Sequence, residues 1–332
     1  MKSIAMLRNQ AQRNALLDAA RYRLSGDAMS FLCETHLQLA PQPSRGDRTL
    51  ILFAHFDPDG VVDPYVAYYL EQLKGVRASI VFVSGSPTLT PESVAPIRSL
   101  CSGIFTRQTL SLDFGSWHLA WRILQESGWS LTQFDRLVLA NDSVYGPLFP
   151  IEEMWSVFHD ADMYGAIESE EQESHLQSFF LAWDLNERTR RFLEKFWNRF
   201  QYIVDKNKLV RRYEIGLSKR ARQEGLSIKP FVSAATVSAT YRQSPAHQWS
   251  DKLSSTNRIN NTLYFWDGLI EHHRFPFLKT ILPRHNMPWH DSMAHLPQFL
   301  EQHTAYPYSL IEANVNRLGY GPSFWANSTP TP

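Results

Sequence analysis

The chain has 332 residues, and its 33 Lys and Arg residues balance its 33 Asp and Glu residues. That length can bury a substantial core in one large domain or two modest ones. A balanced charge excludes an overall field that would hold the protein on nucleic acid or on an anionic membrane. Only two cysteines occur, Cys33 and Cys101, too few for a disulfide framework or a thiolate zinc site. With no signal-peptide or membrane-spanning apolar run, we expect a cytoplasmic protein without a nucleic-acid partner.

The first 40 residues are expected to form one or two amphipathic helices. Apolar residues recur near helical spacing at Leu7, Ala11, Ala15, Leu16 and Ala19, and such spacing favours a helix with one buried face. A polar, Pro-containing linker follows at 41–47. We therefore predict an N-terminal helical arm and linker over 1–47.

Strand and helix signals alternate from Thr49 onward. Apolar runs at 49–54, 79–84 and 135–140 are separated by helical patterns at 62–74, 91–99 and 114–127. Such alternation predicts an α/β fold with a mostly parallel sheet and helices on both faces. Weaker strand signals follow at 163–167 and 176–183, the second of which could equally be helical. Helical patterns follow at 187–201 and 213–224, the last ending at Gly225. We predict a core domain over 48–230 and a C-terminal region over 231–332.

A first group of polar residues follows the first predicted strand. His55, Asp57 and Asp59 lie at its C-terminal end, and in an open α/β sheet that edge forms the binding crevice. A plain Asx turn is the alternative for the two aspartates. Asp63 precedes Pro64 and is expected to cap the next helix, which would be a structural role.

A second group lies in the segment FTRQTLSLDFGSW. Asp113 is expected to be the N-cap of a helix, which would leave the backbone N–H groups of Gly115 and Ser116 free to receive a phosphate or a sugar hydroxyl. Arg107, on the strand before it, could neutralise a diphosphate. The triplet Asp113-Phe114-Gly115 also occurs in the kinase metal motif, but no Gly-rich loop or His-Arg-Asp loop accompanies it. We therefore exclude a kinase.

The third group is Asn141-Asp142-Ser143, directly after the apolar run Leu137–Ala140. One carboxylate flanked by an amide and a hydroxyl can hold a divalent cation whose shell phosphate oxygens and water complete. It can also bind a ribose, and a structural turn is the remaining alternative. Tyr145, just beyond, could stack on a base or a sugar.

The fourth group is weaker. Glu214 lies in RRYEIGLS, near the start of a predicted helix, where a carboxylate could deprotonate an acceptor hydroxyl or simply complement the helix dipole. His175, in HLQSFFLAW, would face the crevice if this segment is a strand. A satisfied, partly buried histidine is the more common outcome for such a residue.

These segments together resemble the rhamnan synthesis protein F family, glycosyltransferase-like proteins of bacterial rhamnose polysaccharide and O-antigen assembly. The strings that carry the resemblance run in order from about residue 49 to 284: AHFDPDGVVDPYVAYYLEQL, VFVS, DFGSW, NDSVYGPLFP, MYGAIES, HLQSFFLAW, FLEKFW, YEIGL, NTLYFWDGLI and FPFLK. DFGSW followed by NDSVYGPL is the most specific combination.

The resemblance implies a GT-A-like fold and an inverting rhamnosyltransferase that uses dTDP-rhamnose and a glycan or lipid-linked glycan acceptor. Asp142 with its two neighbours would then bind the diphosphate and a Mg or Mn ion, and the loop 55–59 would face the nucleotide. DFGSW would line the donor sugar, Glu214 would be the catalytic base, and residues 231–332 would close the acceptor side. Such an enzyme would act in the cytoplasm, in peripheral contact with the inner face of the membrane.

Two other functions compete. HFDPDG also resembles the first metal motif of DHH-type phosphoesterases, with Asp142 as a further manganese ligand. No Asp-His-His triplet exists, however, and the nearest string is Glu271-His272-His273. A noncatalytic partner in a polysaccharide assembly complex is the second alternative, because a degraded donor motif would leave the fold intact.

Overall fold

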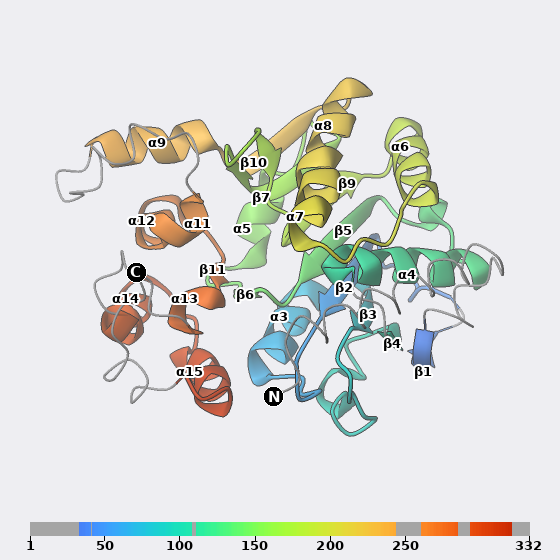
Figure 1. Ribbon diagram of the computed structural model, residues 1–332, viewed down its shortest axis with the longest axis horizontal. Helices are drawn as coiled ribbons and strands as arrows, with labels where there is room; N and C mark the ends of the chain where they lie inside the picture. The colour runs from blue at the N-terminus through green and yellow to red at the C-terminus, as the bar shows by residue number, and fades with distance from the viewer. Residues whose placement is uncertain (1–32, 41, 108–110, 244–259, 285–292, 321–332) are drawn as a thin grey trace.

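The computed structural model describes residues 33–40, 42–107, 111–243, 260–284 and 293–320. Figure 1 shows a twisted central sheet with helices around it. The strands are β1 (Cys33–Leu39), β2 (Thr49–His55), β3 (Ala78–Ser84), β4 (Gly103–Arg107), β5 (Arg136–Asn141), β6 (Val144–Tyr145), β7 (Met163–Ser169), β8 (His175–Leu176), β9 (Phe180–Asp184), β10 (Ile228–Val232) and β11 (Leu278–Lys279).

The α-helices are α3 (Pro64–Lys74), α4 (Leu112–Glu126), α5 (Ile151–Ser156), α6 (Glu187–Asn198), α7 (Lys206–Leu209), α8 (Gly216–Gln223), α9 (Ala234–Gln243), α11 (Asn261–Tyr264), α12 (Trp266–His273), α13 (Ile281–Arg284), α14 (Leu296–His303) and α15 (Tyr308–Arg317). Short 3-10 turns are η1 (Ala95–Ile97), η2 (Leu131–Gln133) and η4 (Met293–His295), and a π-helical turn, η3 (Val210–Ile215), joins α7 to α8.

The order of the main sheet is β1-β4-β3-β2-β5-β9-β7-β10, with β8 paired to β7. β2 pairs in parallel with β3 on one side and with β5 on the other, whereas β1 and β9 run antiparallel to their neighbours. The chain therefore adds strands outward from β2 in one direction and then restarts at β5 in the other. Such a reversal opens a crevice at the C-terminal ends of the two central strands.

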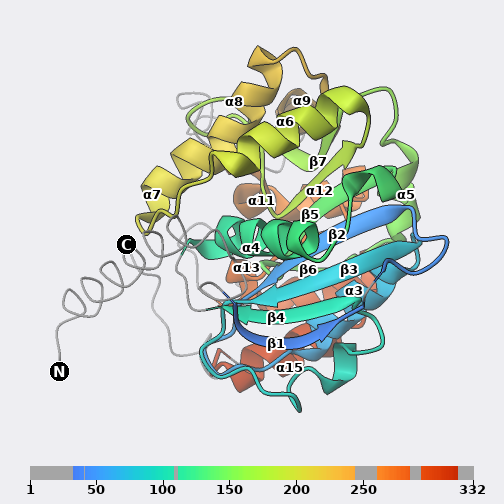
Figure 2. The ribbon, with the colours of Figure 1, turned by 90° about the vertical axis from the view of Figure 1, so that its right-hand side faces the viewer.

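The sheet separates two apolar cores because successive side chains of a strand point to opposite faces. In β2, Ile51 and Phe53 pack into a core shared with α3 and the C-terminal helices. Leu50 and Leu52 pack into the other core, with α4, α6 and α8. Figure 2 shows α4 lying along one face of β5, β2, β3 and β4. The predicted α/β class, mostly parallel and covered on both faces, is confirmed.

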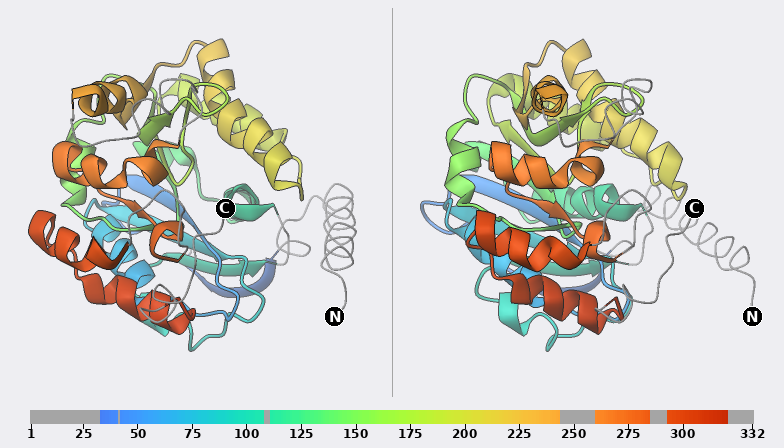
Figure 3. Two further views of the ribbon diagram at one scale, coloured as in Figure 1. Left: turned by 60° about the vertical axis from the view of Figure 1, so that its left-hand side comes forward. Right: turned by 90° about the vertical axis from the view of Figure 1, so that its left-hand side faces the viewer.

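The C-terminal segment returns to the first half of the chain. β11 pairs antiparallel with β6, and α15 packs beside α3, as the views in Figure 3 show. The segment shares one continuous core with the strands of the sheet. The predicted division at residue 230 stays a prediction about folding units.

Arg317, the last residue of α15, ties this segment to the loop after β2. Its Nε and Nη2 donate to the two oxygens of Asp63 at 2.9 and 2.6 Å. Its Nη1 lies 3.2 Å from Asp59 Oδ2, and its Nη2 also bonds Asp57. Asn314 adds a 2.6 Å bond to Asp63. Asp63 is thus structural, as expected, but it holds α15, and its side chain makes no capping bond to α3.

Several predicted elements are confirmed, two are wrong and one is confirmed in part. The strands expected at 49–54, 79–84, 135–140 and 163–167 and the helices expected at 62–74, 114–127 and 187–201 are present, and Gly225, with φ of 76°, follows the end of α8. Residues 33–39 form β1 and no helix, because they pair with the edge of β4. The segment 91–99 has only the turn η1, and 176–183 is divided between β8 and β9. The rest of the predicted N-terminal arm, 1–32, lies outside the described residues.

Replacing Arg317 with Met should lower the free energy of unfolding by about 3 kcal/mol, because two buried carboxylates would lose their cation. Asp57 and Asp63 are about 5 % and 4 % exposed. Urea unfolding measures the change. Arg274→Met is the matched control, since Arg274 pairs with Glu153 at an exposed site and such pairs contribute about 1 kcal/mol or less. Equal effects of the two substitutions would contradict this role of Arg317.

Candidate active site

Asp142 lies where the ends of β2 and β5 meet. Its Oδ2 accepts a 3.0 Å hydrogen bond from the backbone N–H of Phe56, which follows β2. Its own N–H donates to Ala54 O at 3.2 Å, and Tyr65 Oη donates to its carbonyl at 2.9 Å. Its side chain is 13 % exposed. The carboxylate is therefore held in one place at the crevice while one oxygen, Oδ1, makes no hydrogen bond within the described residues.

The two most specific motifs of the sequence meet at Asn141. Its Nδ2 donates to Asp113 Oδ2 at 2.7 Å, and its Oδ1 accepts from the N–H and the hydroxyl of Ser143 at 3.1 and 2.6 Å. Asn141 is 2 % exposed, so it acts as a buried connector between α4 and the loop after β5. The contact brings Asp113 to the same sheet edge as Asp142.

Both acids are hard to ionise in this setting. Burial raises the pKa of Asp142 to about 7, and the nearby charge of Asp57 adds to the rise. Burial and then the charge of Asp142 raise the pKa of Asp113 to about 7. Two neighbouring carboxylates that resist ionisation together are a setting that a cation stabilises.

Lys279 brings a cation to this edge, and the sequence reading missed it. It lies on β11 opposite Val144, two residues after Asp142, and its Nζ is 4.1 Å from the centroid of the Phe179 ring. Within the described residues its ammonium has no hydrogen-bond or ion-pair partner. Burial lowers the pKa of Lys279 to about 8, and the charges of Glu214 and Asp113 partly oppose that fall. The sequence feature that could have identified Lys279 is a lysine directly after the apolar run FPFL.

Glu214 reaches the site from η3. Its Oε1 accepts hydrogen bonds from the backbone N–H and the hydroxyl of Ser178 at 2.8 and 2.9 Å. Ser178 precedes β9, which runs opposite to β5, so it lies at the same sheet edge as Asp142. A π-helical turn often marks a functional position. The helix expected at 213–224 is present as α8, and its first three residues belong to the π-helical turn η3.

A second cation missed by the sequence reading, Arg284, lies at the end of α13. Its Nε and Nη2 donate to Asn314 Oδ1 at 3.2 and 2.8 Å, and its guanidinium carbon is 5.9 Å from the centroid of the Tyr145 ring. Its charge opposes the rise in the pKa of Asp142. The candidate active site is therefore formed by Asp113, Asp142, Glu214, Lys279 and Arg284.

The first predicted group has structural contacts. His55 Nδ1 shares a 2.9 Å hydrogen bond with Ser84 Oγ, and burial lowers the pKa of the imidazole to about 4. Asp57 Oδ1 accepts from the N–H groups of Asp59 and Val61, both at 3.0 Å, which is an Asx turn. Arg317 then neutralises both aspartates. This group lies beside Asp142, and both oxygens of Asp57 are occupied, whereas the Asp59 side chain is 68 % exposed.

The second group differs from expectation in its details. Asp113 lies inside α4, whose N-cap position is Ser111. The N–H of Gly115 donates to Ser111 O at 3.1 Å, and Ser116 Oγ accepts from Arg107 Nε at 2.7 Å. The expected open N–H pair is therefore wrong for Gly115.

Gly115 is required for a different reason. A Cβ at this position would lie 3.0 Å from Arg107 Nη1. Arg107 is about 3 % exposed, and burial lowers its pKa to about 10. Its guanidinium packs against the start of α4 and also bonds Leu112 O. Arg107 therefore orders the segment that carries Asp113.

Two further predicted site residues lie in the interior. Tyr145 is fully buried, and its hydroxyl donates to Asn314 Oδ1 at 2.6 Å. Stacking of its ring on a base or sugar is thus excluded. His175 is about 5 % exposed, and its Nδ1 shares a 2.7 Å hydrogen bond with Glu173 O. It lies on β8 at the end of β7.

A divalent cation fits this site only in part. The described residues contain no group of three or more His, Cys, Asp and Glu side chains that could hold a metal. Asp113 and Asp142 form a carboxylate pair, and Mg²⁺ is often held by one or two carboxylates with substrate phosphates completing its shell. The site therefore fits a cation that arrives with a phosphate. It does not fit the manganese site of a DHH-type phosphoesterase. Glu271-His272-His273 forms the last three residues of α12.

Comparison with known proteins gives a family match. The model of the family described as rhamnan synthesis protein F matches residues 80–325. No curated protein matches the chain closely enough to count as a relative. Across the part of the chain that the structure describes, no helix has the length and hydrophobicity needed to cross a membrane.

The similar solved structures are distant. A cytidylyltransferase from Leptospira borgpetersenii is 12 % identical, covering 65 % of this chain and 99 % of its own, with a TM-score of 0.33. The galactosyltransferase LgtC, solved with donor and acceptor sugar analogs, is 13 % identical, covering 79 % and 98 %, with a TM-score of 0.33. Likenesses this weak assign neither an activity nor a site.

Replacing Asp142 with Asn should stabilise the protein increasingly as the pH rises. The folded pKa of about 7 lies above the ordinary value of 3.8, so the folded wild type binds a proton that the unfolded chain releases between these values. Wild-type stability therefore falls from about pH 4 to pH 7, and the amide does not titrate. We expect the difference in free energy of unfolding to grow by about 2–4 kcal/mol between pH 4 and pH 8. Urea titrations at several pH values measure it.

The control is Asp160→Asn, because the Asp160 side chain is 84 % exposed. Its effect on stability should not change over the same pH range by more than about 0.5 kcal/mol. A pH-independent effect of Asp142→Asn would show that Asp142 ionises normally.

Proposed function

The chain belongs to the rhamnan synthesis protein F family, and from this premise we propose that it is an inverting rhamnosyltransferase. Family membership supports a glycosyltransferase of polysaccharide synthesis. The donor would be dTDP-rhamnose and the acceptor a glycan or lipid-linked glycan of a cell-surface polysaccharide such as O-antigen. The observation that carries the proposal is the half-buried Lys279 ammonium, which has no ion-pair partner among the described residues and lies within electrostatic reach of Asp113 and Glu214.

The diphosphate of the donor would bind at Lys279. A half-buried ammonium has lost part of its hydration and gains from an anionic partner, and a phosphate oxygen would supply that partner. Asp113 and Asp142 would repel the same phosphates unless a cation lies between them. A Mg or Mn ion held by this pair would supply charge neutralisation of the leaving diphosphate. Arg284, within electrostatic reach of Asp142, would add a second positive charge.

Transfer needs one base. The acceptor hydroxyl oxygen attacks the anomeric carbon, the bond from that carbon to the phosphate oxygen breaks, and the nucleoside diphosphate leaves with the bonding electrons. The hydroxyl proton passes to Glu214. Because Ser178 donates twice to Oε1, the carboxylate is oriented and Oε2 remains for the acceptor. A single displacement with one base inverts the anomeric centre.

The reaction would take place on the cytoplasmic side of the membrane. A lipid-linked acceptor would draw the protein to the inner membrane face as a peripheral protein. The C-terminal segment already supplies Lys279 and Arg284, so we assign it to closing the site over the donor and acceptor.

Replacing Lys279 with Met should weaken binding of dTDP about 10- to 100-fold, since a charge-assisted hydrogen bond contributes about 1.5–3 kcal/mol. Calorimetric titration with and without Mg²⁺ measures the affinity. Lys219→Met is the control, because Lys219, on α8, forms an exposed ion pair with Glu173. Equal affinity in wild type and Lys279→Met would remove Lys279 from the donor site.

Replacing Glu214 with Gln should lower kcat about 10²- to 10⁴-fold, the usual contribution of a general base. Donor affinity should change little, because the Gln carbonyl still accepts the bonds from Ser178. Rhamnose transfer to an acceptor glycan measures both parameters. Glu224→Gln, at an exposed pair with Lys195, is the control. A wild type that binds no nucleotide sugar would instead indicate a noncatalytic assembly partner.

A further inference from the structure

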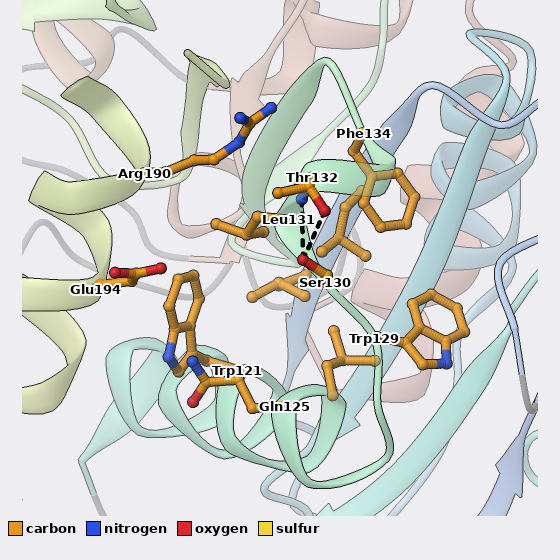
Figure 4. Close-up of a pocket in the computed structure, with 12 residues that line it drawn as sticks. Trp121, Gln125, Trp129, Ser130, Leu131, Thr132, Phe134, Arg190 and Glu194 are labelled. Carbon is orange, nitrogen blue, oxygen red and sulfur yellow. Dashed lines mark hydrogen bonds between the residues drawn. The ribbon is translucent and has the colours of Figure 1, made fainter. Parts of the chain in front are cut away.

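A hollow of about 120 Å³ lies away from the candidate active site. It is enclosed by α4, the loop before β5 and α6, and it is drawn in Figure 4. Leu50 and Leu52 of β2 line it, whereas Asp142 bonds the N–H of Phe56, just after this strand. At about 3.3 Å per residue Phe56 is roughly 13 Å from Leu52 and roughly 20 Å from Leu50 along the strand. The hollow is therefore a separate place on the molecule.

Most of the residues that line the hollow are apolar or aromatic, and the others are polar. Trp121 and Trp129 are 3 % and 5 % exposed. In Figure 4 Trp121 extends from α4 near Glu194, while Arg190, also from α6, lies at another part of the lining, toward Thr132. An apolar lining with a few polar groups is typical of a small-molecule site. The other lining residues are Leu124, Gln125, Ser130, Leu131, Thr132 and Phe134.

Two hydrogen-bond donors at this hollow have no partner among the residues that the structure describes. Trp121 Nε1 and Arg190 Nε are buried and unbonded, and a buried donor without a partner costs about 1–3 kcal/mol. The indoles of Trp183 and Trp197 are unbonded too, but neither lines the hollow. An unbonded indole becomes informative at Trp121 because a space large enough for an acceptor lies beside it.

The chemistry of the lining selects the ligand class. An aliphatic chain would leave both donors unbonded. A phosphate or another anion would meet the carboxylate of Glu194, which has no ion-pair partner within the described residues. A neutral sugar avoids both problems, because its hydroxyl oxygens accept from Trp121 and Arg190 and its hydroxyl hydrogens donate to Glu194. The C–H faces of a sugar ring also pack well on indoles.

We propose that this hollow is a second saccharide site, which holds one neutral hexose or 6-deoxyhexose unit of a glycan. Its volume is that of about ten water-sized spheres, at 10–15 Å³ each, and so suits one sugar ring. The site does not depend on the proposed transfer reaction. It would hold a glycan chain at a distance from the crevice where Asp142 lies.

The test is saturation-transfer NMR and calorimetry on the full chain with methyl α-L-rhamnoside and methyl α-D-glucoside, in the absence of nucleotide. Wild type should bind at least one of them saturably, with a Kd of about 1–10 mM. Arg190→Met and Trp121→Phe should each weaken binding at least about tenfold, the loss of one donor. Arg191→Met, next to Arg190 and paired with Glu187 on the exposed side of α6, should bind like wild type. So should Trp155→Phe on α5.

The outcomes separate this site from the donor site. Lys279→Met should keep the saccharide affinity even where it loses dTDP binding, and a saccharide-binding protein that transfers no sugar would still support the hollow. Absence of saturable binding to wild type would overturn the proposal. So would binding that Arg190→Met and Trp121→Phe leave unchanged, or binding that Lys279→Met abolishes, because the sugar would then occupy the crevice.

Discussion

Parallel pairing of β2 with β5, with Ala54 opposite Asn141, brings the ends of two central strands together. The next residues, Phe56 and Asp142, are then close enough for the N–H of one to bond the carboxylate of the other. Buried strands cannot slip by one residue without turning their apolar side chains to the wrong face. The position of Asp142 is therefore fixed by the packing of the two cores on either side of the sheet.

Acidic residues at this edge divide into two sets according to the cation that each one meets. Asp57, Asp59 and Asp63 surround Arg317 and fasten α15 to the loop after β2. Asp113 and Glu214 lie within electrostatic reach of Lys279, which has no ion-pair partner among the described residues. The carboxylates that pair with Arg317 hold the fold together, whereas Asp113 and Glu214 face a half-buried ammonium that has no ion-pair partner among the described residues.

The strands and the acids that follow them could be predicted because period-two and period-3.6 patterns are local properties of the chain. The same local reading failed at β1, which was included in a helical arm on the pattern of residues 7–19 but pairs as a strand with the edge of β4. It also failed for Tyr145, whose ring is fully buried and whose hydroxyl bonds Asn314 from a helix far along the chain.

The sequence by itself determined the α/β class, most of the main strands and helices between β2 and α8, and the polar residues that follow β2 and β5, because hydrophobic periodicity and turn chemistry act over a few residues. Only the tertiary structure decided which carboxylates form ion pairs with Arg317 and which lie at the sheet edge without such a pair. That choice depends on where Lys279, Arg284 and Arg317 return from the C-terminal segment, and electrostatic pairing at a distance in sequence leaves no local pattern to read.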